Sequence, residues 1–381
     1  SIFKTVTGNL SSTLLNKGTL ELDTVGIVDL DDPNNVYVNT DKASSGIIVD
    51  ANVTVKGTLS DQIALAGKDQ YRGTPGGSTY VVMTNNGTID LSGDNSIGIY
   101  TNNGVINNNT NINVTGNGSA GLFGENGTAI TNSGNINISN NGVGIYAISH
   151  QTPASLPSGT IVDAVTGTIK VKNTGTITAT TGNKAIGIYA ENNKTGGTVT
   201  ESQVDLASGT INLGTSENAI GVYADKGTVT STGSTITVGK NGVAFYVKDS
   251  NVNFNGITIN LNGDNALGLF LDGTSSLTAT GTNTINISGQ NVVLFNMNSS
   301  GTINHNFSVG TVTPGSTYTI GNIVGGIFDY TGSSTLASNG TLVSGRGSAI
   351  FLNGSTITSS AGATNVAAIA LDGRYNLLTP F

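Results

Sequence analysis

The chain has 381 residues, of which 10% are charged, and a formal net charge of −8 at pH 7. This acidic balance, with a pI near 4.6, argues against nucleic acid as a partner, because no basic stripe exists to neutralise phosphates. Glycine contributes 54 residues and cysteine none, which fits an exported bacterial surface protein as well as a cytosolic one.

The first 80 residues show a loose pattern of short aliphatic segments, with copies at Gly26-Ile27-Val28, Gly46-Ile47-Ile48 and Ile63-Ala64-Leu65. We expect residues 1–80 to form looser N-terminal coils or a cap, with the first twenty residues covering one end. Ser1-Ile2-Phe3-Lys4 lacks the features of a signal peptide, and no segment approaches the length of a membrane-spanning helix. We therefore expect a mature fragment of a larger protein.

From residue 98 onward, one phrase recurs: a glycine, an aliphatic residue and an aromatic residue. Its copies, the later ones slightly altered, are Gly98-Ile99-Tyr100, Gly121-Leu122-Phe123, Gly144-Ile145-Tyr146, Gly187-Ile188-Tyr189, Gly221-Val222-Tyr223, Ala244-Phe245-Tyr246, Gly268-Leu269-Phe270, Val293-Leu294-Phe295, Gly326-Ile327-Phe328 and Ala349-Ile350-Phe351. Successive aromatic residues lie 23, 23, 43, 34, 23, 24, 25, 33 and 23 residues apart. A repeat of this period is the signature of a solenoid.

Each copy contains three strand signals separated by turns rich in asparagine and glycine. Gly87-Thr88-Ile89-Asp90-Leu91 alternates polar and apolar residues, Ile97-Gly98-Ile99-Tyr100 follows, and a weaker strand resembles Gly227-Thr228-Val229-Thr230. These features predict an all-β, right-handed parallel β-helix of about 15 coils with a period near 23 residues. A left-handed roll ranks second. We expect a single β-helix over residues 1–381, with regular repeats over 81–375.

The long intervals predict loops inserted near residues 67–79, 148–166, 192–206 and 299–322, and such insertions often bind ligands. The first concentrates charge and an aromatic ring in a chain where charge is scarce. The predicted ligand-binding residues are Asp69, Tyr71, Arg72 and His150. A solvated surface loop is the competing interpretation, and we favour it slightly over a recognition loop.

The aromatic column is a second candidate surface. Strand alternation places Ile97 and Ile99 inward and Tyr100 outward, so that the rings could cradle sugars. Large apolar rings seldom line a solvent face, however, and a bend at the glycine could instead roll them into a corner of the core. We therefore favour ring-on-ring stacking over ligand binding. Asparagines in the first turn should form an internal amide ladder: Asn95, Asn218, Asn265 and Asn291.

The sequence predicts neither an enzyme nor a metal or cofactor site. Acids recur in the first turn at Asp94, Glu217 and Asp264, but lysines at equivalent positions break any calcium cage. The denser cluster of Asp29, Asp31 and Asp32 is better explained by a turn. Polysaccharide lyases and glycosidases need converging carboxylates, and the chain has only three arginines and two histidines.

The Asn-x-Gly-x-Ile and Gly-Ile-Tyr repeats resemble the passenger region of type V autotransporters, most closely the large outer-membrane adhesins of fusobacteria. The pattern is visible from Asn86-Gly87-Thr88-Ile89 to Tyr100-Thr101-Asn102-Asn103, and again from Asn173-Thr174-Gly175-Thr176-Ile177 to Tyr189-Ala190-Glu191-Asn192. The resemblance covers roughly residues 80–375. It implies a secreted or surface-displayed stalk, joined to the outer membrane only through a C-terminal barrel outside this fragment, and it transfers no binding residue.

These observations predict an adhesin that attaches to partner bacteria, or to a glycan or protein receptor on host cells, through loops displayed on a rigid β-helix. The alternatives are a polysaccharide-processing β-helix enzyme and a passive stalk. Side-by-side self-association of the rods is compatible with their polar, Asn/Thr-rich flanks.

Overall fold

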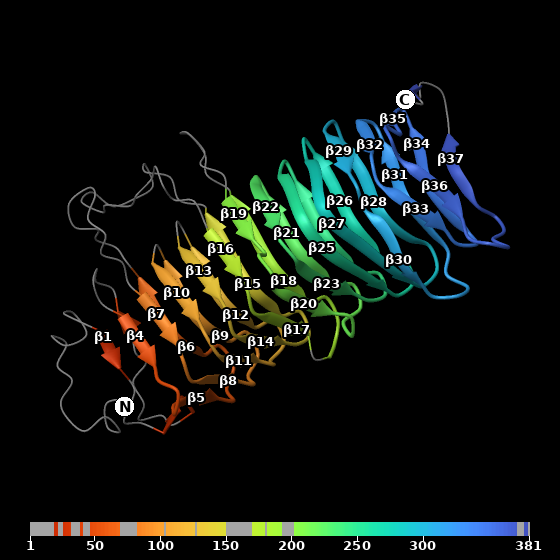
Figure 1. Ribbon diagram of the computed structural model, residues 1–381. Helices are drawn as coiled ribbons and strands as arrows, with labels where there is room; N and C mark the ends of the chain where they lie inside the picture. Colours follow the sequence, from red (N-terminus) through yellow and green to blue (C-terminus); the bar gives the residue numbers. More distant parts are fainter. Residues whose placement is uncertain are drawn as a thin grey trace, which may run out of the picture. The chain divides into compact units, whose positions relative to one another are not determined.

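The computed structural model describes residues 19–21, 26–31, 39–40, 46–68, 82–102, 104–125, 128–149, 170–179, 181–192, 202–371 and 377–379. In these ranges the regular elements are strands, and each coil's strands pair in parallel with those of the next (Figure 1). None of the described residues forms a helix that could cross a membrane. The predicted all-β parallel solenoid is confirmed.

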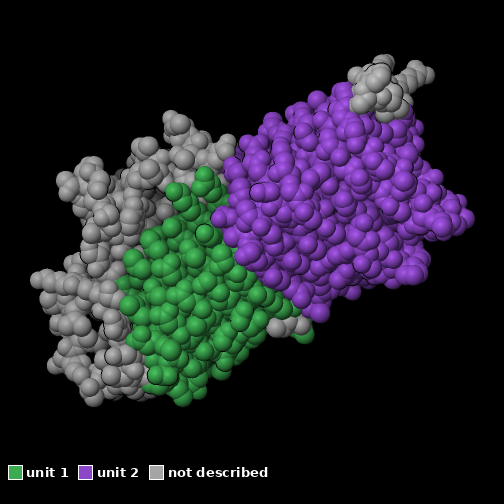
Figure 2. All heavy atoms as spheres, in the orientation of Figure 1, with its two compact units in different colours: residues 1–182, 187–204 green, residues 183–186, 205–381 purple. Residues whose placement is uncertain are grey.

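The chain divides into two compact units, which are described in turn (Figure 2). Unit 1 comprises residues 1–182 and 187–204, and unit 2 comprises residues 183–186 and 205–381. In both, a typical coil gives two strands to one parallel sheet, here called sheet A, and one strand to a second, called sheet B.

Unit 1 contains most of the short, regular coils. Its strands in sheet A are β1 (Thr19–Glu21), β2 (Ile27–Asp29), β4 (Gly46–Val49), β5 (Thr54–Gly57), β7 (Val82–Asn85), β8 (Thr88–Leu91), β10 (Val105–Asn108), β11 (Asn111–Val114), β13 (Ala129–Asn132), β14 (Asn135–Ile138), β16 (Lys170–Asn173), β17 (Thr176–Ala179) and most of β19 (Ser202–Asp205). Its strands in sheet B are β3 (Asn39–Thr40), β6 (Ile63–Lys68), β9 (Ile97–Asn102), β12 (Ala120–Glu125), β15 (Val143–Ser149) and most of β18 (Ile186–Asn192).

Unit 2 continues the same plan with longer strands. In sheet A it has β20 (Thr210–Leu213), β22 (Gly227–Ser231), β23 (Ser234–Val238), β25 (Asn251–Asn262), β27 (Ser276–Ser288), β29 (Thr302–His305), β30 (Ser308–Val312), β32 (Ile327–Tyr330), β35 (Ala349–Phe351) and β38 (Leu377–Thr379), with β33 (Ser333–Leu336) and β36 (Thr356–Ser359) in a separate pair. In sheet B it has β21 (Ile220–Asp225), β24 (Val243–Lys248), β26 (Leu267–Gly273), β28 (Val292–Ser299), β31 (Tyr318–Val324), β34 (Gly340–Arg346) and β37 (Ala367–Leu371).

The number of coils is slightly lower than the predicted value of about 15. Because sheet B receives one strand from each coil, its 13 strands count the coils, and the described residues form about 11 to 13 turns. The predicted number of about 15 coils also counted parts of the chain that lie outside the described ranges.

Period-two alternation builds the core, as the sequence indicates. In β8 the side chains of Ile89 and Leu91 are fully buried while Thr88 and Asp90 face outward. Register places identical residues above one another, so that one row of unit 1 consists of Ile89, Ile112, Ile136 and Ile177. Burial of such aliphatic rows, at about 25 cal/mol per Å², is the main stabilising contribution.

A row of buried asparagines follows the corner between the two sheet A strands of each coil in unit 1. Asn85, Asn108, Asn132 and Asn173 are the last residues of β7, β10, β13 and β16, and all four are 0% exposed. The Nδ2 atom of each donates to Oδ1 of the next, at 2.9, 2.8 and 2.8 Å. This amide ladder satisfies polar groups that the corner buries.

The ladder predicted at Asn95, Asn218, Asn265 and Asn291 was therefore placed at the wrong turn. Those four side chains are exposed, and their backbones adopt left-handed φ values between 54° and 59°. Asparagine tolerates that conformation, which explains why it recurs there. Amide bonds do form, as from Asn265 Nδ2 to Asn241 Oδ1 at 3.1 Å, but on the surface rather than inside.

Residues 299–322, predicted as an inserted loop, form strands of an ordinary coil. In sheet B, Phe295 pairs with Gly321 rather than with Phe328, which lies on β32 in sheet A. The interval of 33 residues was therefore measured between Phe295 and Phe328, which occupy different positions in their coils.

Candidate functional site

The four residues predicted to bind a ligand, Asp69, Tyr71, Arg72 and His150, lie outside the described residues. The same is true of most of each of the predicted insertions at 67–79, 148–166 and 192–206. Their roles stay predictions. Four other features remain: the aromatic column, the acidic turns, a buried histidine and a surface groove.

The aromatic column of unit 1 consists of Tyr100, Phe123, Tyr146 and Tyr189 on the outer side of sheet B. Neighbouring ring centroids are 5.2, 4.8 and 4.9 Å apart, and all four side chains are half-buried. This spacing is close to the distance between strands, so each ring contacts the rings of adjacent coils. The expected stacking is confirmed.

A bend at the glycine of each phrase produces this arrangement. Two consecutive residues, Gly98 and Ile99, are buried, and Ile97 is only half-buried, so the expected inward position of Ile97 was wrong. A Cβ atom on Gly98 would lie 2.5 Å from the carbonyl oxygen of Gly121 in the next coil. Glycine permits this close approach, and in the coil of Tyr246 the equivalent residue is the small Ala244. The bend then returns Tyr100 to the outer side.

Carboxylates hold the phenol groups at both ends of the column. The Tyr100 hydroxyl donates to Glu125 Oε2 at 2.6 Å, and the Tyr189 hydroxyl donates to Glu191 Oε2 at 2.5 Å. Burial, together with the bond to Glu125, raises the pKa of Tyr100 well above its usual range. Since the rings contact one another and the two end phenols bind acids, the column ties neighbouring coils together.

Phe123→Ala is expected to lower the free energy of unfolding by about 1–3 kcal/mol, because it removes edge contacts to both Tyr100 and Tyr146. Phe123→Tyr keeps the ring and should restore stability. Chemical denaturation of the three proteins provides the measurement. Equal stability of the wild type and Phe123→Ala would show that the stack contributes nothing.

In unit 2 the column is shorter. Tyr223, Tyr246 and Phe270 stack with centroid distances of 5.4 and 4.9 Å, but the next coil places Asn296 opposite Phe270. The three remaining aromatic residues of the repeated phrase do not join the column: Phe295 is in the core, and Phe328 and Phe351 lie on sheet A strands.

The acids of the turns bind backbone amides of neighbouring coils. Asp94 Oδ1 accepts from the Asn117 amide at 2.8 Å in unit 1, and Asp264 Oδ1 accepts from the Gln290 amide at 2.8 Å in unit 2. Glu217 forms an ion pair with Lys240 at 3.6 Å. Within the described part of the chain, no three His, Cys, Asp or Glu side chains are grouped as metal ligands would be.

His305 is fully buried in a box of aromatic rings in unit 2. Its ring centroid lies 4.4 Å from that of Phe295, 4.7 Å from Tyr330 and 5.0 Å from Phe328. Nδ1 accepts from the Phe307 amide at 3.2 Å, and Nε2 is buried without a hydrogen-bond partner. Burial lowers the pKa of His305 to about 3, so the ring is neutral near pH 7.

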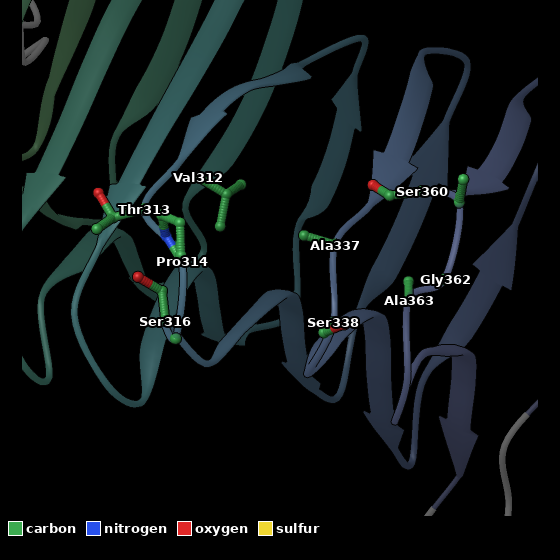
Figure 3. Close-up of a pocket in the computed structure, with 11 residues that line it drawn as sticks. Val312, Thr313, Pro314, Ser316, Ala337, Ser338, Ser360, Gly362 and Ala363 are labelled. Atoms are coloured by element: carbon green, nitrogen blue, oxygen red, sulfur yellow. The ribbon is translucent and has the colours of Figure 1, made fainter.

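A groove of about 320 Å³ crosses three successive turns of unit 2 (Figure 3). Its walls are small side chains, hydroxyls and backbone, contributed by Val312, Thr313, Pro314, Gly315, Ser316, Ala337, Ser338, Ser360, Ala361, Gly362 and Ala363. Two of these hydroxyls already form hydrogen bonds with neighbouring coils: Ser316 Oγ accepts from the Gly289 amide, and Ser338 Oγ accepts from the Thr364 amide. The sequence had singled out Pro314 and its neighbours, but as an inserted loop rather than as a groove wall.

Sequence reasoning missed the buried asparagines and the histidine box. The signal for the asparagines was present: each precedes the next sheet A strand by three residues, as Asn85 precedes Thr88 and Asn173 precedes Thr176. In one copy the neighbouring residue, Asn86, was taken as the start of the motif. The histidine box arises because Asn296, and not Phe295, pairs with Phe270, which places Phe295 in the core. Nothing in the repeated phrase indicates this shift of one residue.

Comparison with known proteins found no matching family model, no similar curated protein and no similar solved structure.

Proposed function

We propose that this chain is an adhesin, a surface-displayed β-solenoid that attaches a bacterium to host cells or to other bacteria. One observation carries the proposal: the most conspicuous side chains of the repeat bond one coil to the next. The asparagine ladder, the aromatic column and the acid-capped turns all have partners in neighbouring coils. Such a repeat is a scaffold for presenting other segments, in keeping with its resemblance to autotransporter passengers.

In this proposal, recognition belongs to loops and turns between the strands and not to the strands themselves. These are the predicted loops that contain Asp69, Tyr71, Arg72 and His150, and the groove near Pro314. The groove offers hydroxyls and backbone groups without charge, which suits a neutral glycan or an extended peptide. A secreted or cell-surface location follows from this role.

The test is binding of the labelled, purified chain to a glycan array, to host cells and to bacteria. We expect selective binding that Tyr71→Ala together with Arg72→Ala, or His150→Ala, reduces at least about tenfold, a loss of about 1.4 kcal/mol. Ala361→Trp, which fills the groove, tests the groove in the same assay. Asn109→Ala, an exposed change on the repeat, is the matched control and should bind like the wild type.

Two outcomes contradict the proposal. A chain that binds none of these targets, beside a longer natural protein that does adhere, would be a passive stalk. Release of reducing ends from polysaccharides by the purified chain would identify an enzyme instead.

A further inference from the structure

Asparagine followed by glycine is a dipeptide that loses ammonia spontaneously, because glycine leaves its own amide nitrogen unhindered. Eight such pairs have both residues in the described part of the chain: Asn86-Gly87, Asn117-Gly118, Asn141-Gly142, Asn241-Gly242, Asn255-Gly256, Asn262-Gly263, Asn339-Gly340 and Asn353-Gly354. The reacting groups are the same in all eight, so a large difference in reactivity between them has to come from the fold.

The reaction is a nucleophilic substitution within the backbone. The glycine amide nitrogen gives up its proton to water or hydroxide and attacks Cγ of the asparagine, while the bond from Cγ to Nδ2 breaks and Nδ2 takes up a proton and leaves as ammonia. One water molecule then opens the resulting succinimide ring, at Cγ to give aspartate or at the backbone carbonyl to give isoaspartate. No atom is oxidised or reduced, and water is the only co-reactant.

The first requirement is a glycine amide that is free to lose its proton and to move. In six of the eight pairs this amide donates a hydrogen bond at 2.9 to 3.2 Å, which has to break before the nitrogen can attack; these are the amides of Gly87, Gly118, Gly142, Gly242, Gly256 and Gly340. Among the eight pairs, only the Gly263 and Gly354 amides donate no hydrogen bond.

The second requirement is space, and it separates these two pairs. A Cβ atom on Gly263 would lie 2.4 Å from the backbone nitrogen of Lys240, whereas a Cβ atom on Gly354 would meet no atom within 4 Å. Asn262 is also the last residue of β25, where its register partner is Ser288 in the next coil. The backbone of Asn262-Gly263 is therefore held by its neighbours.

The turn that contains Asn353 and Gly354 is much less restrained. Both residues are exposed, and they lie between β35 and β36 (Figure 1). Strand β36 belongs to a sheet of two strands and has no buried residue, so few contacts oppose a rearrangement of the turn that precedes it.

We propose that Asn353 is a modification site, at which the folded chain forms a succinimide with Gly354 faster than at any other of the eight pairs. The product adds a negative charge at a position where Asn353 Nδ2 now donates to Asp329 Oδ1 of the preceding coil at 3.4 Å. Conversion therefore replaces a hydrogen bond between coils with repulsion between two carboxylates. The argument is independent of the proposed adhesin function.

A matched control exists in the same chain. Asn117-Gly118-Ser119 and Asn353-Gly354-Ser355 share their sequence, and Asn117 and Gly118 are exposed like Asn353 and Gly354. The two sites differ in the glycine amide, since that of Gly118 donates to the Asn140 carbonyl at 3.0 Å. Hydrogen bonding and packing are therefore compared without a change of reacting groups.

The test is to incubate the full folded chain in mildly alkaline buffer made with heavy-oxygen water, and to follow each pair by peptide mass spectrometry. We expect Asn353 to convert at least about tenfold faster than Asn117 and the other six pairs, because one hydrogen bond and the packing of the turn oppose the reaction elsewhere. Both aspartate and isoaspartate should form at position 353, with the heavy oxygen incorporated. In urea, where the fold is lost, the eight pairs should convert at similar rates.

The proposal is overturned if Asn353 converts no faster than Asn117 in the folded chain. It is also overturned if the preference for Asn353 is as large in urea, which would show that the local sequence causes it, or if aspartate forms without isoaspartate, which would exclude the succinimide. Circular dichroism during the incubation shows that the chain stays folded. Since no ligand or cell enters this measurement, its failure leaves the adhesion assay unaffected.

Discussion

Replacing Asn108 with alanine is expected to lower the free energy of unfolding by about 2–5 kcal/mol. Asn108 Oδ1 accepts from Asn85 Nδ2 at 2.9 Å, and its Nδ2 donates to Asn132 Oδ1 at 2.8 Å and to the Thr110 carbonyl at 3.0 Å. The substitution interrupts the ladder at a site that is 0% exposed. Asn132 Oδ1 loses its bond from Asn108, and Asn85 Nδ2 keeps only its bond to the Asn111 carbonyl at 3.3 Å. A buried polar atom that loses its partner costs about 1–3 kcal/mol. Equilibrium urea denaturation, followed by circular dichroism, measures the loss.

The adjacent residue provides a matched control. Asn109 also bonds to neighbouring coils, through Nδ2 to Asn86 Oδ1 at 2.8 Å and by accepting from Ser133 Oγ at 3.1 Å, but it is exposed. Water can replace these bonds, so Asn109→Ala should change stability by no more than about 0.5 kcal/mol. Similar losses for the two variants would show that burial does not distinguish the inner ladder from the outer one.

Acid is expected to destabilise unit 2 through His305. Its pKa is about 3 in the folded chain and about 6.5 when unfolded, so between these values only the unfolded chain takes up the proton. The contribution of the neutral, buried His305 ring to the free energy of unfolding is therefore fully present above pH 6.5. It is lost as the pH falls, by about 1.4 kcal/mol per pH unit, which amounts to about 3 kcal/mol at pH 4. The rings around it, those of Phe295, Phe307, Phe328 and Tyr330, offer no charge to offset protonation.

The contribution of His305 is isolated by comparing His305→Phe with the wild type across this pH range. Every other ionisable group is common to the two proteins, so the effects of those groups cancel in the difference. We expect the stability of the wild type relative to the variant to fall steadily from pH 6.5 to pH 4. A difference that does not change with pH would show that His305 takes up its proton equally in both states.

The sequence was sufficient to predict the architecture because the repeat constrains each coil in the same way. Alternation in Thr88-Ile89-Asp90-Leu91 places two residues in the core, and stacking of equivalent coils repeats that choice. The aromatic column was predicted for the same reason as far as Phe270. Each of its members follows a glycine or alanine at a fixed offset, and that small residue permits the bend.

Prediction failed where the same residue type serves two local environments. Asparagine occupies both the buried corner at Asn85 and the left-handed turn at Asn95, and composition alone does not separate a side chain that bonds inward from one that relieves backbone strain. Phenylalanine likewise fills the core at Phe295 and the outer column at Phe270. The groove near Pro314 was unpredictable because its walls come from three turns that are separated in sequence.

The asparagine ladder also bears on how such a chain can change in evolution. Within the ladder each asparagine binds the asparagine before it and the one after it, and Asn85, Asn108 and Asn132 present the same groups at the same register. Loss of a whole coil by recombination would bring Asn85 against Asn132 and rejoin surfaces that already match. Gain of a coil would extend the ladder by the same rule. The length of the solenoid is therefore a heritable quantity that can vary by whole turns while the asparagine ladder is rebuilt from the same groups.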